Sequence, residues 1–208
     1  MPDAPRAVIF DIGNVLIGWD PEGFYDRALG HKARVRLFAE VDLAAMNLSV
    51  DAGAPFRATV YETAEAHPDW AEPIRWWHDR WIELASPRIE HSVRLLMALR
   101  ARGVPVFALT NFGDDSFAYA QTQYDFLNAF DRAYVSGRMG VVKPDPRIYA
   151  MVEADCGLPP ERLLFTDDKT ENLDAAAARG WQVHRFEGPE GWAARLVAAG
   201  CLNAEDAT

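Results

Sequence analysis

The chain has 208 residues, half of them hydrophobic and a quarter charged, which suits one globular domain, alone or with an insertion. Its net charge of −10 argues against nucleic acid and against an anionic membrane as partners, because both would repel an acidic surface. No apolar run approaches the roughly 20 residues of a membrane span, and the N-terminus lacks a signal-peptide pattern. The two cysteines form neither a disulfide framework nor a zinc motif. We therefore expect a cytoplasmic protein.

A short apolar run from Ala7 to Phe10 ends on Asp11 and is soon followed by Gly13. Its β-branched and aromatic residues predict a buried strand that delivers a carboxylate to the loop at its C-terminal end. Ligands of open α/β sheets bind at that end of the strands. Asp11 is therefore the first candidate functional residue.

The stretch 18–86 has a different character. Apolar residues recur there at helical spacing, no alternating strand pattern is visible, and Pro73 suits the first turn of a helix that carries Trp76, Trp77 and Trp81. Since an apolar stripe at helical spacing is normally buried, we interpret the tryptophans as packing between short helices, with one or two free to face a ligand. The sequence predicts a helical insertion between two segments of a core domain, 1–17 and 87–208.

From residue 87 onward, predicted helices and strands alternate. We expect helices at 90–102, 116–123, 147–155 and 171–178, and strands at 104–109, 133–135, 163–165 and 182–186. Asp145 before Pro146 is typical of a helix start, and Gly103 suits a C-terminal cap. Repeated strand–helix units predict an α/β fold with a Rossmann-like, mainly parallel sheet and helices on both faces.

Polar residues follow several predicted strands. Thr110 and Asn111 come after the second strand, and Asp167 and Asp168 after the fourth. Because the C-terminal ends of parallel strands share one edge of a sheet, we expect these groups to converge on Asp11. Carboxylates without histidine or cysteine form an oxygen-only site that suits Mg²⁺.

Lys143 is one of three lysines among 21 basic residues and lies in a loop before a helix. An ammonium, a hydroxyl and an amide beside a metal can hold phosphate oxygens. Each signal is weak alone: Thr110-Asn111 could cap a helix, and Asp167-Asp168 could form a solvated turn. Together, and in this order along the chain, these signals are stronger evidence for a phosphate site than each one alone.

Four ordered segments resemble the motifs of the haloacid dehalogenase superfamily. They are Phe-Asp-Ile-Gly-Asn-Val-Leu at 10–16, Leu-Thr-Asn at 109–111, Val-Lys-Pro-Asp at 142–145 and Phe-Thr-Asp-Asp at 165–168. The helical insertion resembles that superfamily's helical cap domain, which implies a cap at 18–86. The resemblance covers nearly the whole chain.

The resemblance implies a nucleophile and a metal site. Asp11 would form an aspartyl-phosphate intermediate, and Mg²⁺ would be held by Asp11, Asp168 and the carbonyl of Gly13. Asp167 would be either a neighbour of the metal or the partner of Lys143. The implied activity is Mg²⁺-dependent hydrolysis of small phosphomonoesters.

The resemblance also implies the contacts of the substrate. Thr110 and Asn111 would bind the transferring group, and Lys143 would neutralise its charge and orient Asp11. The partner would be a small phosphorylated metabolite, which the sequence does not identify. The sequence carries no signal for an oligomeric state.

Gly13 departs from the superfamily pattern. Phosphatases of the superfamily usually carry a second aspartate there, which protonates the leaving alkoxide and later activates water, and such a group contributes roughly 10²–10⁴-fold in rate. Some members, including a sugar-1-phosphate phosphatase, also have Gly-Asn at this point. Replacement protons could come from water, from the substrate or from another acid such as Asp20, which could instead cap the first insertion helix.

Three interpretations stay open, and we prefer the first. The chain could be a phosphatase with an altered proton source. It could be a metal-independent 2-haloacid dehalogenase, whose halide leaves without a proton, but the pair Asp167-Asp168 would then be unexplained. It could also be a catalytically weak protein that binds a phosphorylated ligand.

Overall fold

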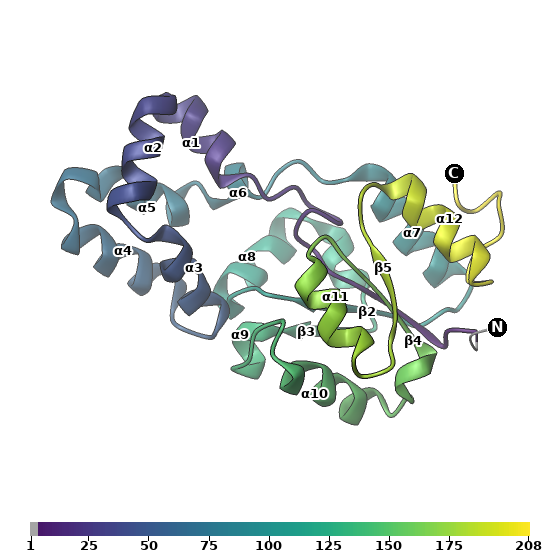
Figure 1. Cartoon of the computed structure of the whole chain (residues 1–208). Helices are drawn as coiled ribbons and strands as arrows, with labels where there is room; N and C mark the ends of the chain where they lie inside the picture. Colours follow the sequence, from purple (N-terminus) through teal and green to yellow (C-terminus); the bar gives the residue numbers. More distant parts are fainter. Residues whose placement is uncertain (1–3) are drawn as a thin grey trace.

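The structure is a computed structural model, which describes residues 4–208. Its core is a five-stranded parallel sheet (Figure 1). The strands are β1 (Ala7–Phe10), β2 (Val106–Thr110), β3 (Arg132–Val135), β4 (Leu163–Asp167) and β5 (Gln182–Arg185), in the order β3-β2-β1-β4-β5. Central β1 pairs with both β2 and β4. The predicted α/β, Rossmann-like fold is confirmed.

Alternate residues of β1 point to opposite faces of the sheet. Val8 and Phe10 belong to a buried cluster with residues of α7 (Glu90–Ala101), α8 (Asp114–Gln123) and α12 (Pro189–Ala198), whereas Ala7 and Ile9 belong to a second cluster with residues of α10 (Pro146–Cys156) and α11 (Thr170–Ala177). All four side chains are fully buried. Burial on both faces explains why the strand is a continuous apolar run rather than an alternating one.

Two strands end on candidate residues. β2 begins two residues later than the predicted strand 104–109 and ends on Thr110, and β4 extends beyond the predicted 163–165 to end on Asp167. Short elements complete the core: η2 (Asp125–Ala129), α9 (Ser136–Met139) and η3 (Pro160–Arg162). The sheet edge therefore carries polar side chains directly at the ends of its central strands.

The predicted insertion contains only helices among its regular elements. These are α1 (Pro21–Leu29), α2 (His31–Glu40), α3 (Leu43–Asp51), α4 (Phe56–Ala66), η1 (Pro68–Trp70), α5 (Ala71–Asp79) and α6 (Trp81–Leu84). They form the second lobe in Figure 1. Trp77 and Trp81 are buried, as the helical spacing predicts. That 18–86 behaves as a separate cap domain stays a prediction, and we call this segment the cap below.

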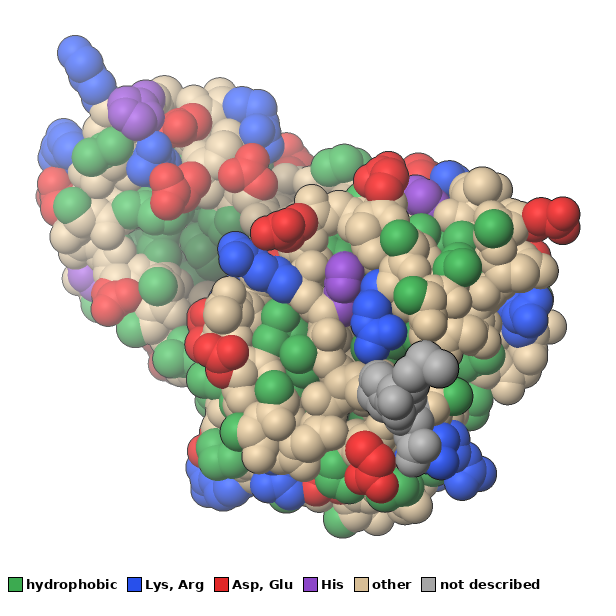
Figure 2. Space-filling view, turned by 45° about the vertical axis from the view of Figure 1, so that its right-hand side comes forward, with side chains coloured by type: hydrophobic (Ala, Val, Ile, Leu, Met, Phe, Trp, Pro, Cys, Tyr) green, Lys and Arg blue, Asp and Glu red, His purple; other side chains and the backbone are tan. Residues whose placement is uncertain are grey.

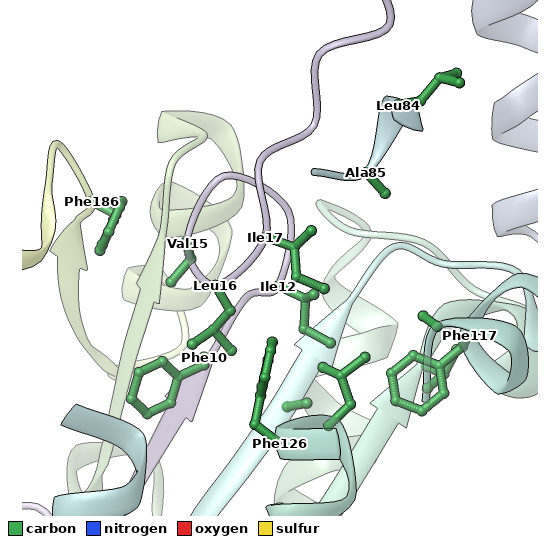
Figure 3. Close-up of a cluster of buried hydrophobic side chains, with 14 of the residues drawn as sticks. Phe10, Ile12, Val15, Leu16, Ile17, Leu84, Ala85, Phe117, Phe126 and Phe186 are labelled. Atoms are coloured by element: carbon green, nitrogen blue, oxygen red, sulfur yellow. The ribbon is translucent and has the colours of Figure 1, made fainter. Parts of the chain in front are cut away.

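The loop after β1 is anchored by its own apolar side chains. Ile12, Leu16 and Ile17 are buried and pack into the core (Figure 3). The backbone N–H groups of Leu16 and Ile17 both donate to the Ile12 carbonyl, at 2.9 and 3.0 Å. Asn14 has a φ of 55°, a left-handed conformation that asparagine tolerates better than most residues. The loop therefore holds Asp11 at a fixed position beyond the strand.

Two expectations concern the rest of the chain. Within residues 4–208, no helix combines the length and apolar character needed to cross a membrane. Both cysteines are free thiols: Cys201 is buried, and Cys156 is partly exposed. Free cysteines are usually buried, so Cys156 is less buried than is typical.

Candidate active site

The ends of β1, β2 and β4 meet at one edge of the sheet. From β1 the chain proceeds to β2 and β3 on one side, then crosses to β4 and β5 on the other, and ligands bind at such a switch point. A cavity of about 600 Å³ opens there. Its lining includes six of the seven predicted site residues: Asp11, Gly13, Thr110, Asn111, Lys143 and Asp168.

Lys143 lies at the centre of the site. Its Nζ donates to Oδ2 of Asp167 at 2.6 Å and to the Leu109 carbonyl at 2.9 Å, and it lies 3.0 Å from Oδ1 of Asp11. Three N–H donors thus meet three oxygens. Burial alone would lower the pKa of Lys143, but the charges of Asp11 and Asp167 outweigh it and hold that pKa above its ordinary value. Lys143 is a fixed positive charge.

Asp167, the seventh predicted residue, lies beneath the cavity and is fully buried. Its Oδ1 accepts from the backbone N–H of Lys169 at 2.8 Å, and Nδ2 of Asn172 lies 3.0 Å from each of its oxygens. Together with the bond from Lys143, these contacts engage both carboxylate oxygens. Of the two roles that the sequence leaves open for Asp167, this geometry favours the partner of Lys143.

Asp11 is nearly inaccessible to solvent. Burial is the largest influence and raises the pKa of Asp11 to about 7; Lys143 opposes the shift and Asp167 adds to it. A nucleophile must be ionised, so a further cation beside Asp11 would favour the reactive form. The site is electrostatically suited to a divalent metal.

A cluster of carboxylates offers such a cation its ligands. Asp11, Asp167 and Asp168 each have an oxygen within 4.8 Å of the others. Because Asp167 is saturated by other partners, Asp11 and Asp168 hold the available oxygens. Nδ2 of Asn14 donates to Asp168 at 2.9 Å, and Oδ1 of Asn14 accepts from the Trp19 N–H at 2.9 Å, which fixes the Asp168 carboxylate. This oxygen-only set fits Mg²⁺.

Asn111 is at the predicted place, but its side chain is engaged. Its Nδ2 donates to the Lys143 carbonyl at 2.9 Å, and its Oδ1 accepts from the Lys143 N–H at 2.8 Å. This paired contact fixes the loop that carries the lysine. A direct contact between Asn111 and substrate stays a prediction, as does the predicted contact of Thr110.

Sequence reasoning missed several polar residues that also line the cavity. They include Asn47 and Asp51 on α3, and Lys169 and Asn172 at the start of α11. Position alone could have indicated the last two, which follow the Asp167-Asp168 motif closely, whereas nothing in the sequence marks Asp51. Burial raises the pKa of Asp51 to about 7, although Lys169 lowers it.

The part of the cavity lining that the cap supplies is mainly apolar. It includes Phe38, Leu43, Leu48, Phe56, Trp77 and Trp81 from the cap. Figure 2 shows hydrophobic side chains around the hollow between the two lobes. Leu48 is 52% exposed although it is hydrophobic, so part of this wall is open to a ligand.

Asp20, a possible acid, is used elsewhere. Its Oδ1 accepts from the Gly23 N–H at 2.9 Å, so it caps α1 ahead of Pro21. Its side chain is also close to Arg27 and is not among the residues that line the cavity. The capping interpretation is the one the geometry supports.

Comparison with known proteins identifies relatives of this chain. A sesquiterpene phosphatase of Aspergillus oryzae is 25% identical over 84% of this chain and 86% of its own length. An (S)-2-haloacid dehalogenase of Pseudomonas fluorescens is 32% identical, but over only 42% of this chain and 39% of its own length. The magnesium complex of a HAD family enzyme from Bacteroides thetaiotaomicron shares the fold, with a TM-score of 0.73 at 21% identity over 93% of this chain and 99% of that one. Residues 5–180 match the haloacid dehalogenase-like hydrolase family, and the chain belongs to that family.

Proposed function

We propose that the protein is a Mg²⁺-dependent phosphatase that hydrolyses small phosphomonoesters through an aspartyl-phosphate on Asp11. The observation that carries this proposal is the buried Lys143 ammonium, 3.0 Å from an Asp11 oxygen, beside an oxygen-only set of ligands. A carboxylate and a phosphate dianion repel each other. A preorganised positive charge relieves that repulsion and stabilises the charge that develops on the transferring group.

Each candidate residue has a role in this proposal. Asp11 attacks phosphorus, and Lys143 orients Asp11 and neutralises the charge of the transferring group, while Asp167 holds the lysine in place. Asp11, Asp168 and the Gly13 carbonyl would hold Mg²⁺, which when bound supplies Lewis-acid neutralisation of the phosphoryl charge.

Thr110 and Asn111 complete the proposed phosphate site. Thr110 ends β2 beside the cavity, where it can face the transferring group, and Asn111 follows it. The pair of hydrogen bonds between Asn111 and Lys143 ties the lysine to the same edge. The partner is a small phosphorylated metabolite.

The cavity wall supports an apolar alcohol as the other part of the substrate. A pocket recognises an apolar group by removing its surface from water, at roughly 25 cal/mol for each Å². The cap presents Phe38, Leu48 and Phe56 on this wall. The related phosphatase that acts, by its name, on a sesquiterpene supports the same class of substrate.

The direct test is hydrolysis of p-nitrophenyl phosphate and hexyl phosphate with Mg²⁺ and with EDTA. We expect turnover of both with Mg²⁺ and loss of turnover in EDTA. Full activity in EDTA would refute the proposal, because the role of Asp11 and Asp168 as metal ligands would then be wrong.

A metal-independent 2-haloacid dehalogenase is the second candidate. It is favoured by Gly13, because glycine supplies no proton and a leaving halide needs none. It is also favoured by the related haloacid dehalogenase. It leaves Asp168, whose carboxylate lies close to that of Asp11, without a role. Chloride release from 2-chloropropionate in EDTA would establish it in place of the phosphatase.

A further inference from the structure

The proposed hydrolysis needs a proton that Gly13 cannot supply. The carboxylic acids of the described residues that line the cavity are Asp11, Glu22, Asp42, Asp51 and Asp168. Asp11 and Asp168 already serve as nucleophile and metal ligands in the proposed function. The three remaining acids, which all lie in the cap, are therefore the candidate proton donors.

Two of those acids have other partners and face solvent. Glu22 pairs with Arg34 at 2.9 Å and its side chain is 64% exposed. Asp42 caps α3 by accepting from the Ala45 N–H at 2.8 Å, and it is exposed. Neither geometry suits a proton donor in an enclosed site.

Asp51, the last residue of α3, is held against the core. Its backbone carbonyl accepts from the Ser136 hydroxyl at 2.6 Å. Its carboxyl accepts from Nδ2 of Asn47 at 2.9 Å and from the backbone N–H of Gly113. Trp77 donates from Nε1 to Oδ1 of Asn47 at 3.0 Å, which directs the Asn47 amide nitrogen at the acid. The carboxyl of Asp51 therefore has a fixed position.

Close backbone packing places that carboxyl at the phosphate end of the cavity. A Cβ on Gly113 would lie 2.5 Å from Cγ1 of Val50, and a Cβ on Gly53 would lie 2.9 Å from the Gly137 carbonyl. The end of α3 thus lies directly on the loop that begins with the predicted phosphate ligands. Its charge interacts with those of Lys169, Asp11 and Lys143.

We propose that Asp51, a residue of the cap, is the general acid and base that replaces the side chain absent at Gly13. This inference rests on the proposed phosphatase function. As an oxygen of Asp11 bonds to phosphorus, the bond from phosphorus to the leaving oxygen breaks, and that oxygen takes both the bonding electrons and the proton of Asp51. In the second step, a water molecule gives a proton to the Asp51 carboxylate while the oxygen of that water bonds to phosphorus. The Asp11–phosphorus bond then breaks, which releases inorganic phosphate and restores both carboxyl groups.

The protonation of Asp51 suits both steps. Burial is the largest influence and raises its pKa to about 7, with Lys169 and Lys143 lowering it and Asp11 raising it. A donor whose pKa lies near the working pH can both give and accept a proton. The hydrogen bonds from Asn47 and Gly113 stabilise the carboxylate left after the first step.

The test is Asp51→Asn, compared on two substrates with Mg²⁺. p-Nitrophenolate leaves without help, whereas a hexyl alkoxide needs a proton. We expect kcat/KM for hexyl phosphate to fall by roughly 10²–10⁴-fold. On p-nitrophenyl phosphate we expect a burst of p-nitrophenol followed by slow turnover, because the second step lacks its base.

The matched control is Asp115→Asn. Asp115 also contacts the cap, through the Phe56 N–H at 3.4 Å, but does not line the cavity. We expect wild-type rates on both substrates. If the wild-type enzyme does not hydrolyse p-nitrophenyl phosphate with Mg²⁺, the proposed function itself is wrong. This outcome distinguishes failure of the proposed function from failure of the inference about Asp51.

Rescue distinguishes proton transfer from a structural role. A Cβ on Gly13 would meet no atom within 4 Å, so Gly13→Asp has room for its side chain. In the double variant with Asp51→Asn, Gly13→Asp should raise kcat/KM for hexyl phosphate at least tenfold above that of Asp51→Asn alone. It should also restore the fall in this rate at alkaline pH. Equal losses on both substrates without a burst, or no rescue, would overturn the inference.

Discussion

Lys143 and Asp167 form an ion pair of 2.6 Å in which the side chains are only 1% and 0% exposed. Asn172 and the Lys169 N–H hold the carboxylate from the other side. The ammonium is therefore aimed at Asp11 before any substrate arrives, which is the preorganisation that makes electrostatic stabilisation effective.

Replacing Lys143 should affect both folding and activity. Lys143→Met leaves Asp11 and Asp167 facing each other without a counter-charge, and loss of one partner of a buried pair typically costs about 3–5 kcal/mol. Urea denaturation should show that loss, and hydrolysis should be abolished. Lys32→Met, on the exposed surface of α2, is the control and should match wild type. Wild-type stability of the Lys143 variant would mean that the pair does not exist in solution.

Asp11→Asn should separate chemistry from folding. An amide is isosteric with the carboxylate but cannot form the intermediate, so we expect turnover to fall by about 10³-fold or more. Circular dichroism should show an intact fold. Retained turnover would mean that another group is the nucleophile.

Asn14→Gly tests the support of the metal site. Glycine accepts the left-handed backbone at this position but removes the bond that orients Asp168. Loss of such a supporting contact typically weakens metal binding by about 10–100-fold. The Mg²⁺ concentration for half-maximal activity should rise by that factor. The control is Asn128→Gly, because Asn128 bonds Gln121 away from the cavity; an unchanged Mg²⁺ requirement in Asn14→Gly would contradict the assignment.

The stability of the protein should depend on the charge of Asp51. Its folded pKa is raised from 3.8 to about 7, so the folded state holds the proton more tightly than the unfolded state. The free energy of unfolding that this tighter proton binding contributes is complete below pH 4 and is lost as the pH rises through 7. Asp51→Asn should therefore be more stable than wild type at pH 8, by about 1–3 kcal/mol after allowance for partial access of solvent. Thermal unfolding at pH 4 should show no such gain, and equal differences at both pH values would contradict the raised pKa.

Leu48→Gln tests the apolar wall. Glutamine keeps the helix propensity of this position but removes apolar surface worth about 1 kcal/mol. The KM for hexyl phosphate should rise about fivefold, and the KM for methyl phosphate should not change. Met97→Gln, at a similarly exposed hydrophobic residue outside the cavity, should change neither KM. Equal effects on both substrates would argue against an apolar subsite.

The sheet and most of its site residues could be predicted from local signals. Each buried strand is a short apolar run, and the polar residue at its end must lie at the common edge of a parallel sheet. That argument places Asp11, Thr110 and Asp168 at the cavity without any knowledge of packing. The periodicity of the apolar residues in 18–86 predicts the helices of the insertion in the same way.

The finer partnerships depend on tertiary contacts that no spacing reveals. Asn111 pairs with the backbone of Lys143, 32 residues away, and Asp167 is saturated by Asn172 and Lys143. Asp51 lies at the cavity only because α3 packs on the glycines of the core. Its sequence context is that of an ordinary helix end.

The Ser136 hydroxyl accepts from the Phe112 N–H and donates to the Asp51 carbonyl. The loop after β2 and the end of α3 are thereby tied to the same atom, whereas most of the other cap residues that line the cavity are apolar. Related proteins could therefore diversify their substrates across most of the cap without rebuilding the hydrolytic apparatus. The end of α3 is where such divergence would be constrained, because change there disturbs recognition and reactivity together.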